Sequence, residues 1–215
     1  MYTLYGRAGS GSAVVEVLLE EIGADYRVES VGKGPEAPRG YAEINPLGQV
    51  PALILPDGTI MTESAAITIY LADKFPELGL APPPDSPKRP IYLRWLVYLA
   101  TSIYISDLRI YYCERYSTDP GHASGIREAA VARMAHEWDV YAAELGDRPF
   151  ILGEEMSGVD IYAAMLATWN VDVPAFFRKH PNIKRMYDRV RTRPSVARVW
   201  TRHGIETWEP QAATA

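Results

Sequence analysis

Apolar and polar residues in the first part of the chain follow strand and helix periods in turn. Residues 2–5 alternate and favour a strand, residues 13–22 carry apolar positions at helical spacing, and residues 26–30 favour a strand again. Gly23 follows the helical run at the position where a glycine commonly ends a helix. A helix between two short strands predicts a right-handed crossover with the strands parallel.

A second group of elements follows a predicted loop at residues 31–40. Two short strand-like runs, residues 52–55 and 59–61, flank Pro56-Asp57-Gly58, which is a strong signal for a hairpin. Ser64 then opens a helix that Pro76 stops. The order is therefore βαβ followed by ββα, which predicts a small α/β unit.

The rest of the chain is helical in pattern. Residues 76–90 contain six prolines, a composition that forces extended backbone and cannot continue a helix. We therefore predict a first domain at residues 1–80, a proline-rich linker at 81–90 and an all-helical domain at 91–215. The helices predicted in that domain are residues 91–116, 126–145, 159–169, 183–190 and 196–201.

Composition excludes several classes of protein. The chain has 215 residues, 47% of them hydrophobic, which is enough for packed cores and too much for a disordered chain. The longest nearly uncharged apolar stretch, residues 95–105, is well short of the roughly 20 residues that a membrane-spanning helix needs. The N-terminus lacks the pattern of a signal peptide, and the lone Cys113 cannot form an intramolecular disulfide, so we expect a cytoplasmic protein.

Net charge changes along the chain. The whole sequence carries −5, so general attraction to nucleic acid or to a membrane surface is not expected. Residues 1–80 hold 5 Lys and Arg against 11 Asp and Glu, whereas residues 81–215 hold 17 against 16. Local dipoles must therefore hold any anionic ligand of the first domain. The four histidines show no metal-ligand spacing, and no metal site is expected.

The most specific motif lies at residues 45–53, with the sequence NPLGQVPAL. Pro51 stands directly before a predicted strand and is compatible with a cis peptide bond. Such a bond would turn the Val50 backbone outward, where its donor and acceptor could dock a peptide-like ligand as an extra strand. The alternative is an ordinary turn before an edge strand.

Hydroxyl residues stand at three predicted helix starts. Ser64, after Glu63, is a good N-cap whose helix dipole favours a bound carboxylate, although a plain cap has the same sequence. Gly9-Ser10-Gly11-Ser12 precedes the first helix, where one hydroxyl could serve only as a cap. Ser157 and Asp160 have the spacing of a capping box ahead of a helix that we expect to be buried.

Taken in order, these segments resemble the cytosolic glutathione transferase family, in particular its bacterial serine- and cysteine-type members. The resemblance rests on NPLGQVPAL, on TESAAI at residues 62–67, on SGVDIY at 157–162 and on HPNIKRMYDRVRTRPSV at 180–196. It implies a thioredoxin-like domain joined to an all-helical domain, with glutathione bound to the first and an apolar electrophile between the two. It also implies a homodimer.

The resemblance assigns glutathione-binding roles by position. The Val50 backbone would pair with the cysteinyl part of glutathione, Pro51 would be the cis residue, and Glu63 with Ser64 would hold the γ-glutamyl end.

Three further polar residues complete this implied set. Gln49 precedes the cis pair, and Lys33 and Arg39 are expected to reach the glycyl carboxylate. Both cations fit solvated surface positions equally well.

The residue that activates the sulfur is left open among three, with a backbone N–H alone as a further alternative. Family members use a Tyr, Ser or Cys just after the first strand, and this sequence offers Tyr5, Ser10 and Ser12 but no cysteine there. We favour Ser10 as the thiolate donor and Ser12 as the helix N-cap; the spacing to the following helix, one residue longer than expected, keeps Ser12 as an alternative donor. A serine hydroxyl cannot form a mixed disulfide, so conjugation is favoured over redox exchange.

The long helix that begins at residue 91 is implied to line the co-substrate pocket. The expected lining residues are Tyr104, Asp107, Leu108 and Tyr111, although aromatic residues at helical spacing also suit a core or a subunit interface. The expected function is conjugation of glutathione to electrophilic apolar small molecules. The alternatives are a non-catalytic module that binds ligands or proteins, or a specialised glutathione-dependent isomerase, dehalogenase, etherase or disulfide reductase.

Overall fold

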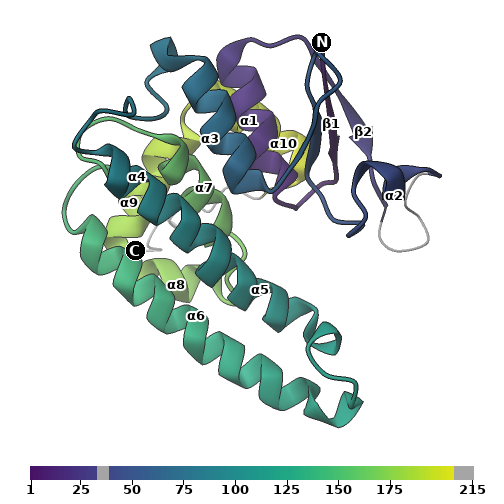
Figure 1. The fold of residues 1–215 in the computed structure, drawn as a ribbon. Coiled ribbons are helices and arrows are strands. Elements are labelled where there is room, and N and C mark those ends of the chain that lie inside the picture. The colour runs from purple at the N-terminus through teal and green to yellow at the C-terminus, as the bar shows by residue number, and fades with distance from the viewer. Residues whose placement is uncertain (33–38, 206–215) are drawn as a thin grey trace.

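A four-stranded sheet forms the N-terminal part of the computed structural model, which describes residues 1–32 and 39–205 (Figure 1). The strands are β1 (Tyr2–Gly6), β2 (Tyr26–Ser30), β3 (Ala52–Ile54) and β4 (Ile60–Thr62), in the order β2-β1-β3-β4. β1 and β2 are parallel, whereas β3 runs antiparallel to both β1 and β4. The predicted parallel crossover and hairpin are both confirmed.

Strand alternation separates the two faces of this sheet. Tyr2 and Leu4 of β1 belong to the main core, where α1 (Ser12–Ile22) and α3 (Ser64–Lys74) pack side by side (Figure 1). Tyr5 packs instead in a small cluster with Tyr41 of α2 (Tyr41–Ile44). The sequence pattern did not predict α2, because four residues are too few to show a helical period.

All other helices follow the sheet. They are α4 (Arg89–Tyr98), a π-helical turn (Leu99–Ile103), α5 (Tyr104–Tyr111), α6 (Ala123–Leu145), α7 (Gly158–Ala167), α8 (Val173–Lys179), α9 (Pro181–Arg191) and α10 (Pro194–His203), with 3-10 turns η2 (Pro76–Leu78), η4 (Cys113–Arg115) and η5 (Pro120–His122). Beyond residue 62, the described residues contain no strand, only an isolated bridge between Phe150 and Gly153. The predicted fold class is confirmed.

One helix prediction in this part was wrong, and one helix was not predicted. The helix expected at residues 91–116 ends at Tyr111, because the backbone of Tyr112 leaves helical geometry with φ −135° and ψ 45°. The seven-residue α8 was missed, since its apolar residues span only two turns. In the described part of the chain no helix is long and apolar enough to cross a membrane.

All ten residues of α7 are buried. The predicted capping box at its start is confirmed. Asp160 Oδ2 accepts hydrogen bonds from the backbone N–H and the hydroxyl of Ser157, and Oδ1 accepts one from the Ile151 N–H, each at 2.8 Å. Asp160 therefore joins the loop before α7 to the buried helix.

The last helix returns to the sheet domain and lies beside α1 (Figure 1). Glu16 on α1 is 3% exposed and meets the His203 Nε2 at 2.7 Å and the Arg202 Nε at 2.8 Å. Glu21 forms an ion pair with Arg193 at the start of α10. These contacts hold α10, near the C-terminal end of the described residues, against α1 of the sheet domain.

Candidate active site

Two adjoining cavities lie between the loop before α1, the loop before β3 and the helix α5. The large cavity has a volume of about 490 Å³ and the small cavity about 100 Å³. Four residues line both of them: Gln49, Val50, Tyr104 and Leu108. The two cavities therefore adjoin along a shared wall. The small cavity, with Asn45, Glu63 and Ser64 in its lining, is a polar arm beside the larger chamber.

The loop before β3 supplies the shared wall. The Val50–Pro51 peptide bond is cis, as predicted. The Gln49 carbonyl accepts hydrogen bonds from the Tyr41 hydroxyl at 2.5 Å and from the Asn45 side-chain amide at 2.7 Å, which fixes the loop. Among the described residues, the Val50 N–H and C=O form no backbone hydrogen bond, so both remain available to a ligand.

Glu63 has an unusual backbone conformation in the wall of the small cavity. Its φ is 65°, the left-handed region that favours glycine, and in the described part of the chain no other non-glycine residue has a positive φ. Such a conformation costs roughly 1–3 kcal/mol and persists where the surrounding structure imposes it, often at binding sites.

Ser64 follows Glu63 but does not cap α3, so that prediction was wrong. Glu63 occupies the N-cap position, and Ser64 is the first residue of the helix. The Ser64 hydroxyl instead lies 2.7 Å from the hydroxyl of Tyr162 in α7. A tertiary partner in the all-helical part thus replaces the local cap.

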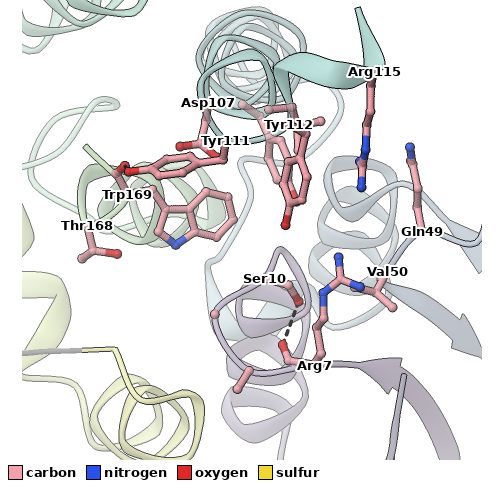
Figure 2. Close-up of a pocket in the computed structure, with 14 residues that line it drawn as sticks. Arg7, Ser10, Gln49, Val50, Asp107, Tyr111, Tyr112, Arg115, Thr168 and Trp169 are labelled. Carbon is pink, nitrogen blue, oxygen red and sulfur yellow. Dashed lines mark hydrogen bonds between the residues drawn. The ribbon is translucent and has the colours of Figure 1, made fainter. Parts of the chain in front are cut away.

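Ser10 lines the large cavity and is 7% exposed. Its hydroxyl donates to the Arg7 carbonyl at 2.8 Å (Figure 2) and lies 2.8 Å from the hydroxyl of Ser12. The Ser12 hydroxyl is also 3.1 Å from the same carbonyl. The two hydroxyls and one carbonyl form a triangle at the start of α1.

Ser12 was predicted as the N-cap of α1, and this was wrong. Gly11 takes that position, and Ser12 is the first helical residue. Its side chain points back to the end of β1, because its hydroxyl accepts a hydrogen bond from the Arg7 N–H at 3.2 Å. The side chain also lies against Gly6, where an added Cβ would be 2.6 Å from it. Ser12 lines neither of the two cavities.

The other predicted residues are divided between the site and its surroundings. Tyr5 packs against Tyr41, with ring centroids 5.5 Å apart, and lines neither cavity. Arg39 is exposed and also lines neither. Lys33 lies outside the described residues.

One face of α5 forms the wall opposite Ser10. Tyr104, Asp107, Leu108 and Tyr111 all line the large cavity. The Tyr104 ring stands edge-on to the Trp169 ring, with centroids 5.2 Å apart. Its hydroxyl lies close to Gly11 at the start of α1, where a Cβ would be only 2.8 Å from the hydroxyl oxygen. Tyr104, Tyr111 and Trp169 therefore form an aromatic part of the chamber wall.

Models of known families match both parts of this chain. The N-terminal domain of glutathione S-transferases matches residues 12–74, and the C-terminal domain of the same family matches residues 122–194. The chain belongs to the glutathione S-transferase family. The resemblance inferred from the motifs is confirmed, and glutathione is the co-substrate that defines this family of enzymes.

Individual relatives align with nearly the whole chain. Glutathione S-transferase GstA of Escherichia coli O157:H7 is 29% identical, over 94% of this chain and 99% of its own. The glutathione S-transferase-like protein YncG of Escherichia coli K12 is 31% identical, over 95% and 100%. A glutathione transferase homologue from Sulfitobacter, solved with bound glutathione, superposes with a TM-score of 0.84 at 27% identity, over 96% and 99%.

The transferase site contains residues that sequence reasoning missed. Arg7, Tyr112, Arg115, Thr168 and Trp169 line the large cavity. Figure 2 shows the guanidinium groups of Arg7 and Arg115 directed toward the same space beside Gln49. They come from separate segments without a local motif, so only the tertiary fold brings them together.

Burial changes the ionisation of two groups in the α5 wall. Burial raises the pKa of the Asp107 carboxyl from 3.8 to about 7. Burial, with a smaller contribution from the nearby Asp107, raises the pKa of the Tyr104 hydroxyl to about 12. Tyr104 is therefore a neutral hydrogen-bonding group at physiological pH.

Proposed function

We propose that this transferase activates the glutathione thiol with Ser10 and conjugates it to an apolar electrophile in the large cavity. The observation that carries the proposal is the position of the Ser10 hydroxyl in the wall of the large cavity, which adjoins the small cavity lined by Val50, Glu63 and Ser64. A thiol held between these two walls would point from the small cavity into the large one.

The polar arm suits the peptide part of glutathione. The free N–H and C=O of Val50 would pair with the cysteinyl unit as an added strand does. Glu63 would hold the γ-glutamyl ammonium, while the N-terminus of α3 at Ser64 would hold the γ-glutamyl carboxylate. Gln49 lines both cavities and would contact the ligand where they join.

The hydroxyl triangle supports thiolate formation. When the Ser10 hydroxyl turns from the Arg7 carbonyl toward sulfur, the Ser12 hydroxyl at 3.1 Å can donate to that carbonyl in its place. No buried acceptor is then left without a donor. A charge-assisted hydrogen bond of roughly 1.5–3 kcal/mol lowers a thiol pKa of about 8.5 by about 1–2 units.

The test compares Ser10→Ala with Ser12→Ala, which each remove one hydroxyl of the same pair. Isothermal titration gives glutathione affinity, and ultraviolet difference spectra give the thiolate fraction at each pH. We expect Ser10→Ala to raise the bound thiol pKa by about 1–2 units, with a smaller effect from Ser12→Ala. Equal thiol pKa values in the wild type and Ser10→Ala would contradict the assignment.

We also propose a homodimer that uses the face formed by α3 and α4. Ile91 and Val97 on α4 are 39% and 49% exposed, which leaves apolar surface for a partner copy. Size-exclusion chromatography with light scattering tests this: a mass of about twice the 24.0 kDa of the chain is expected, and a monomer mass would contradict it.

A further inference from the structure

The short helix α2 has one buried side chain, and that side chain is bonded to the loop beside the cavities. Tyr41 is 2% exposed, whereas the other three residues of α2 are half-buried or exposed. The Tyr41 ring packs against Tyr5 and in the small cluster that contains Val50. Its hydroxyl donates to the Gln49 carbonyl at 2.5 Å. The helix therefore holds Tyr41 against the residues that precede Pro51.

Two donors meet at the Gln49 carbonyl oxygen. Besides Tyr41, the side-chain amide of Asn45 donates to this oxygen at 2.7 Å. Asn45 is 5% exposed, and its Oδ1 accepts from the Leu47 N–H at 3.1 Å, so the amide cannot turn without losing both bonds. Burial raises the pKa of the Tyr41 hydroxyl, which is therefore a neutral donor at neutral pH. The first residue of α2 and the residue that ends it thus fix one oxygen atom.

A fixed carbonyl also fixes the N–H of the same peptide unit. The Gln49–Val50 bond is trans, since the cis bond of this loop lies one residue later. In a planar trans unit the C=O and the N–H point in opposite directions, so the Val50 N–H is directed away from the two donors. Val50 lines both cavities, and within the described ranges its N–H has no backbone partner. Hydrogen bonds to the oxygen also polarise the amide and strengthen its N–H as a donor.

We propose that Tyr41 is a positioning residue that acts through the Gln49 carbonyl: it directs the Val50 N–H to the cysteinyl carbonyl of glutathione and so favours peptide thiols over thiols that lack this carbonyl. Tyr41 lines neither cavity, so it acts through the loop and not by contact with the ligand. This inference rests on the proposed function, because it requires glutathione to pair with the Val50 backbone.

A role of this kind affects binding and not the chemistry at sulfur. The cysteinyl carbonyl takes no part in the reaction, so its contact with Val50 is the same before and during attack by sulfur. Tyr41 therefore contributes to glutathione affinity, and the ionisation of the bound thiol, which we assign to Ser10, does not depend on it.

The test is a cycle of two proteins and two ligands. The proteins are the wild type and Tyr41→Phe, which keeps the ring and its packing and removes only the hydroxyl. The ligands are glutathione and γ-glutamylcysteamine, which keeps the γ-glutamyl group and the thiol but lacks the cysteinyl carbonyl. Isothermal titration gives the four Kd values. The analogue also lacks glycine, but this weakens its binding to both proteins, so the effect cancels in the cycle.

Tyr26→Phe is the matched control. Tyr26 lies in the same sheet domain, its hydroxyl donates to the Glu20 Oε1 at 2.9 Å, and it lines neither cavity. We expect Tyr41→Phe to raise the Kd of glutathione roughly 3–10-fold, and to change the Kd of the analogue by less than about twofold. Tyr26→Phe should change neither Kd. Ultraviolet difference spectra should give the same bound thiol pKa in the wild type and in Tyr41→Phe.

Other outcomes overturn the inference or separate it from the proposed function. An unchanged glutathione Kd in Tyr41→Phe overturns it, as do equal losses for the two ligands, which would show a general effect on the shape of the site. A bound thiol pKa that rises in Tyr41→Phe also overturns it, because the residue would then act on sulfur. If Ser10→Ala leaves the bound thiol pKa unchanged, the proposed function fails, and the cycle still decides the role of Tyr41. A wild type that binds no glutathione overturns both.

Discussion

The hydroxyl of Ser64 at the start of α3 lies 2.7 Å from the hydroxyl of Tyr162 in α7. Both residues line the small cavity, so the all-helical part of the chain orients a residue proposed to bind glutathione. Tyr162 is 1% exposed, and burial raises the pKa of its hydroxyl well above the usual range. The pair is therefore a fixed neutral contact between the two parts of the fold.

Tyr162→Phe should weaken glutathione binding, because the Ser64 hydroxyl loses the group that fixes its orientation. Loss of the hydrogen bond should lower the free energy of unfolding by about 1 kcal/mol. We expect the glutathione Kd to rise about 3–10-fold, which corresponds to an effect of similar size. Urea unfolding and isothermal titration measure the two quantities.

Tyr141→Phe is the matched control for this variant. Tyr141 is fully buried, its hydroxyl donates to the Met186 Sδ at 3.7 Å, and it lines neither cavity. It should therefore lose stability without a change in glutathione Kd. Equal changes in Kd for both variants would show that the Ser64 contact has no specific role.

Glu16→Ala should destabilise the fold strongly, because it removes the buried partner of His203 and Arg202 between α1 and α10. Breaking a buried ion pair costs about 3–5 kcal/mol. Glu29→Ala, which removes an exposed pair with Arg27 at 3.4 Å, should cost about 1 kcal/mol or less. Urea unfolding of the three proteins at pH 7 compares them, and similar losses for both variants would contradict the argument.

The effect of Glu16 should also depend on pH. Burial raises the pKa of its carboxyl, but the hydrogen bonds from His203 and Arg202 outweigh burial and hold the pKa below the ordinary 4.5. A depressed pKa gives stability that is present above the unfolded value and is lost as pH falls through the folded value. The difference between the wild type and Glu16→Ala should therefore shrink below about pH 4.5.

Local pattern was enough to predict most of the fold. Strand alternation, helical spacing and the Pro56-Asp57-Gly58 turn predicted the four strands and the helices around them. It failed for α2 and α8, which are too short for a period, and for the end of α5, where Tyr112 leaves the helix without a proline or glycine to mark the break.

Sequence motifs located cavity-lining residues where these lie on one short segment. Val50, Glu63, Ser64 and Ser10 line the cavities because each belongs to a turn or helix start that the motifs mark. The cap assignments of Ser12 and Ser64 failed for a physical reason. A serine at a helix start commonly accepts a hydrogen bond from a backbone N–H of the first turn. Here the Ser12 hydroxyl bonds to the Arg7 backbone and the Ser64 hydroxyl to the Tyr162 hydroxyl instead.

Asp160→Ala should cost more stability than its position in a helix implies. It leaves three buried donors without an acceptor, on Ile151 and Ser157, at about 1–3 kcal/mol for each unmet group. We expect a total loss of at least about 3 kcal/mol. The control is Asp172→Ala, where an exposed N-cap of α8 accepts from the Ala175 N–H and should cost about 1 kcal/mol.

Urea unfolding of these two aspartate variants at pH 7 decides between a buried network and an ordinary cap. If both variants lose about 1 kcal/mol of unfolding free energy, water accepts the hydrogen bonds that the Asp160 carboxylate oxygens accept in the wild type. The Asp160 carboxyl then does not hold the loop before α7.

The buried Asp107 carboxyl should make the protein less stable as pH rises. Its pKa is about 7 in the folded protein against an ordinary 3.8, so between these values the folded state binds more protons than the unfolded state. The free energy of unfolding then falls with rising pH across this window, by up to about 4 kcal/mol in total. Asp107→Asn removes this contribution and leaves the buried Asp160 unchanged.

Unfolding of the wild type and Asp107→Asn in urea at pH 5 and pH 8 isolates the effect, because other titrating groups are common to both proteins. Relative to the wild type, the variant should gain stability between the two pH values. A difference that is the same at pH 5 and pH 8 would mean that the carboxyl is ionised throughout this range. Asp107 would then carry its negative charge at neutral pH despite its burial in the α5 wall.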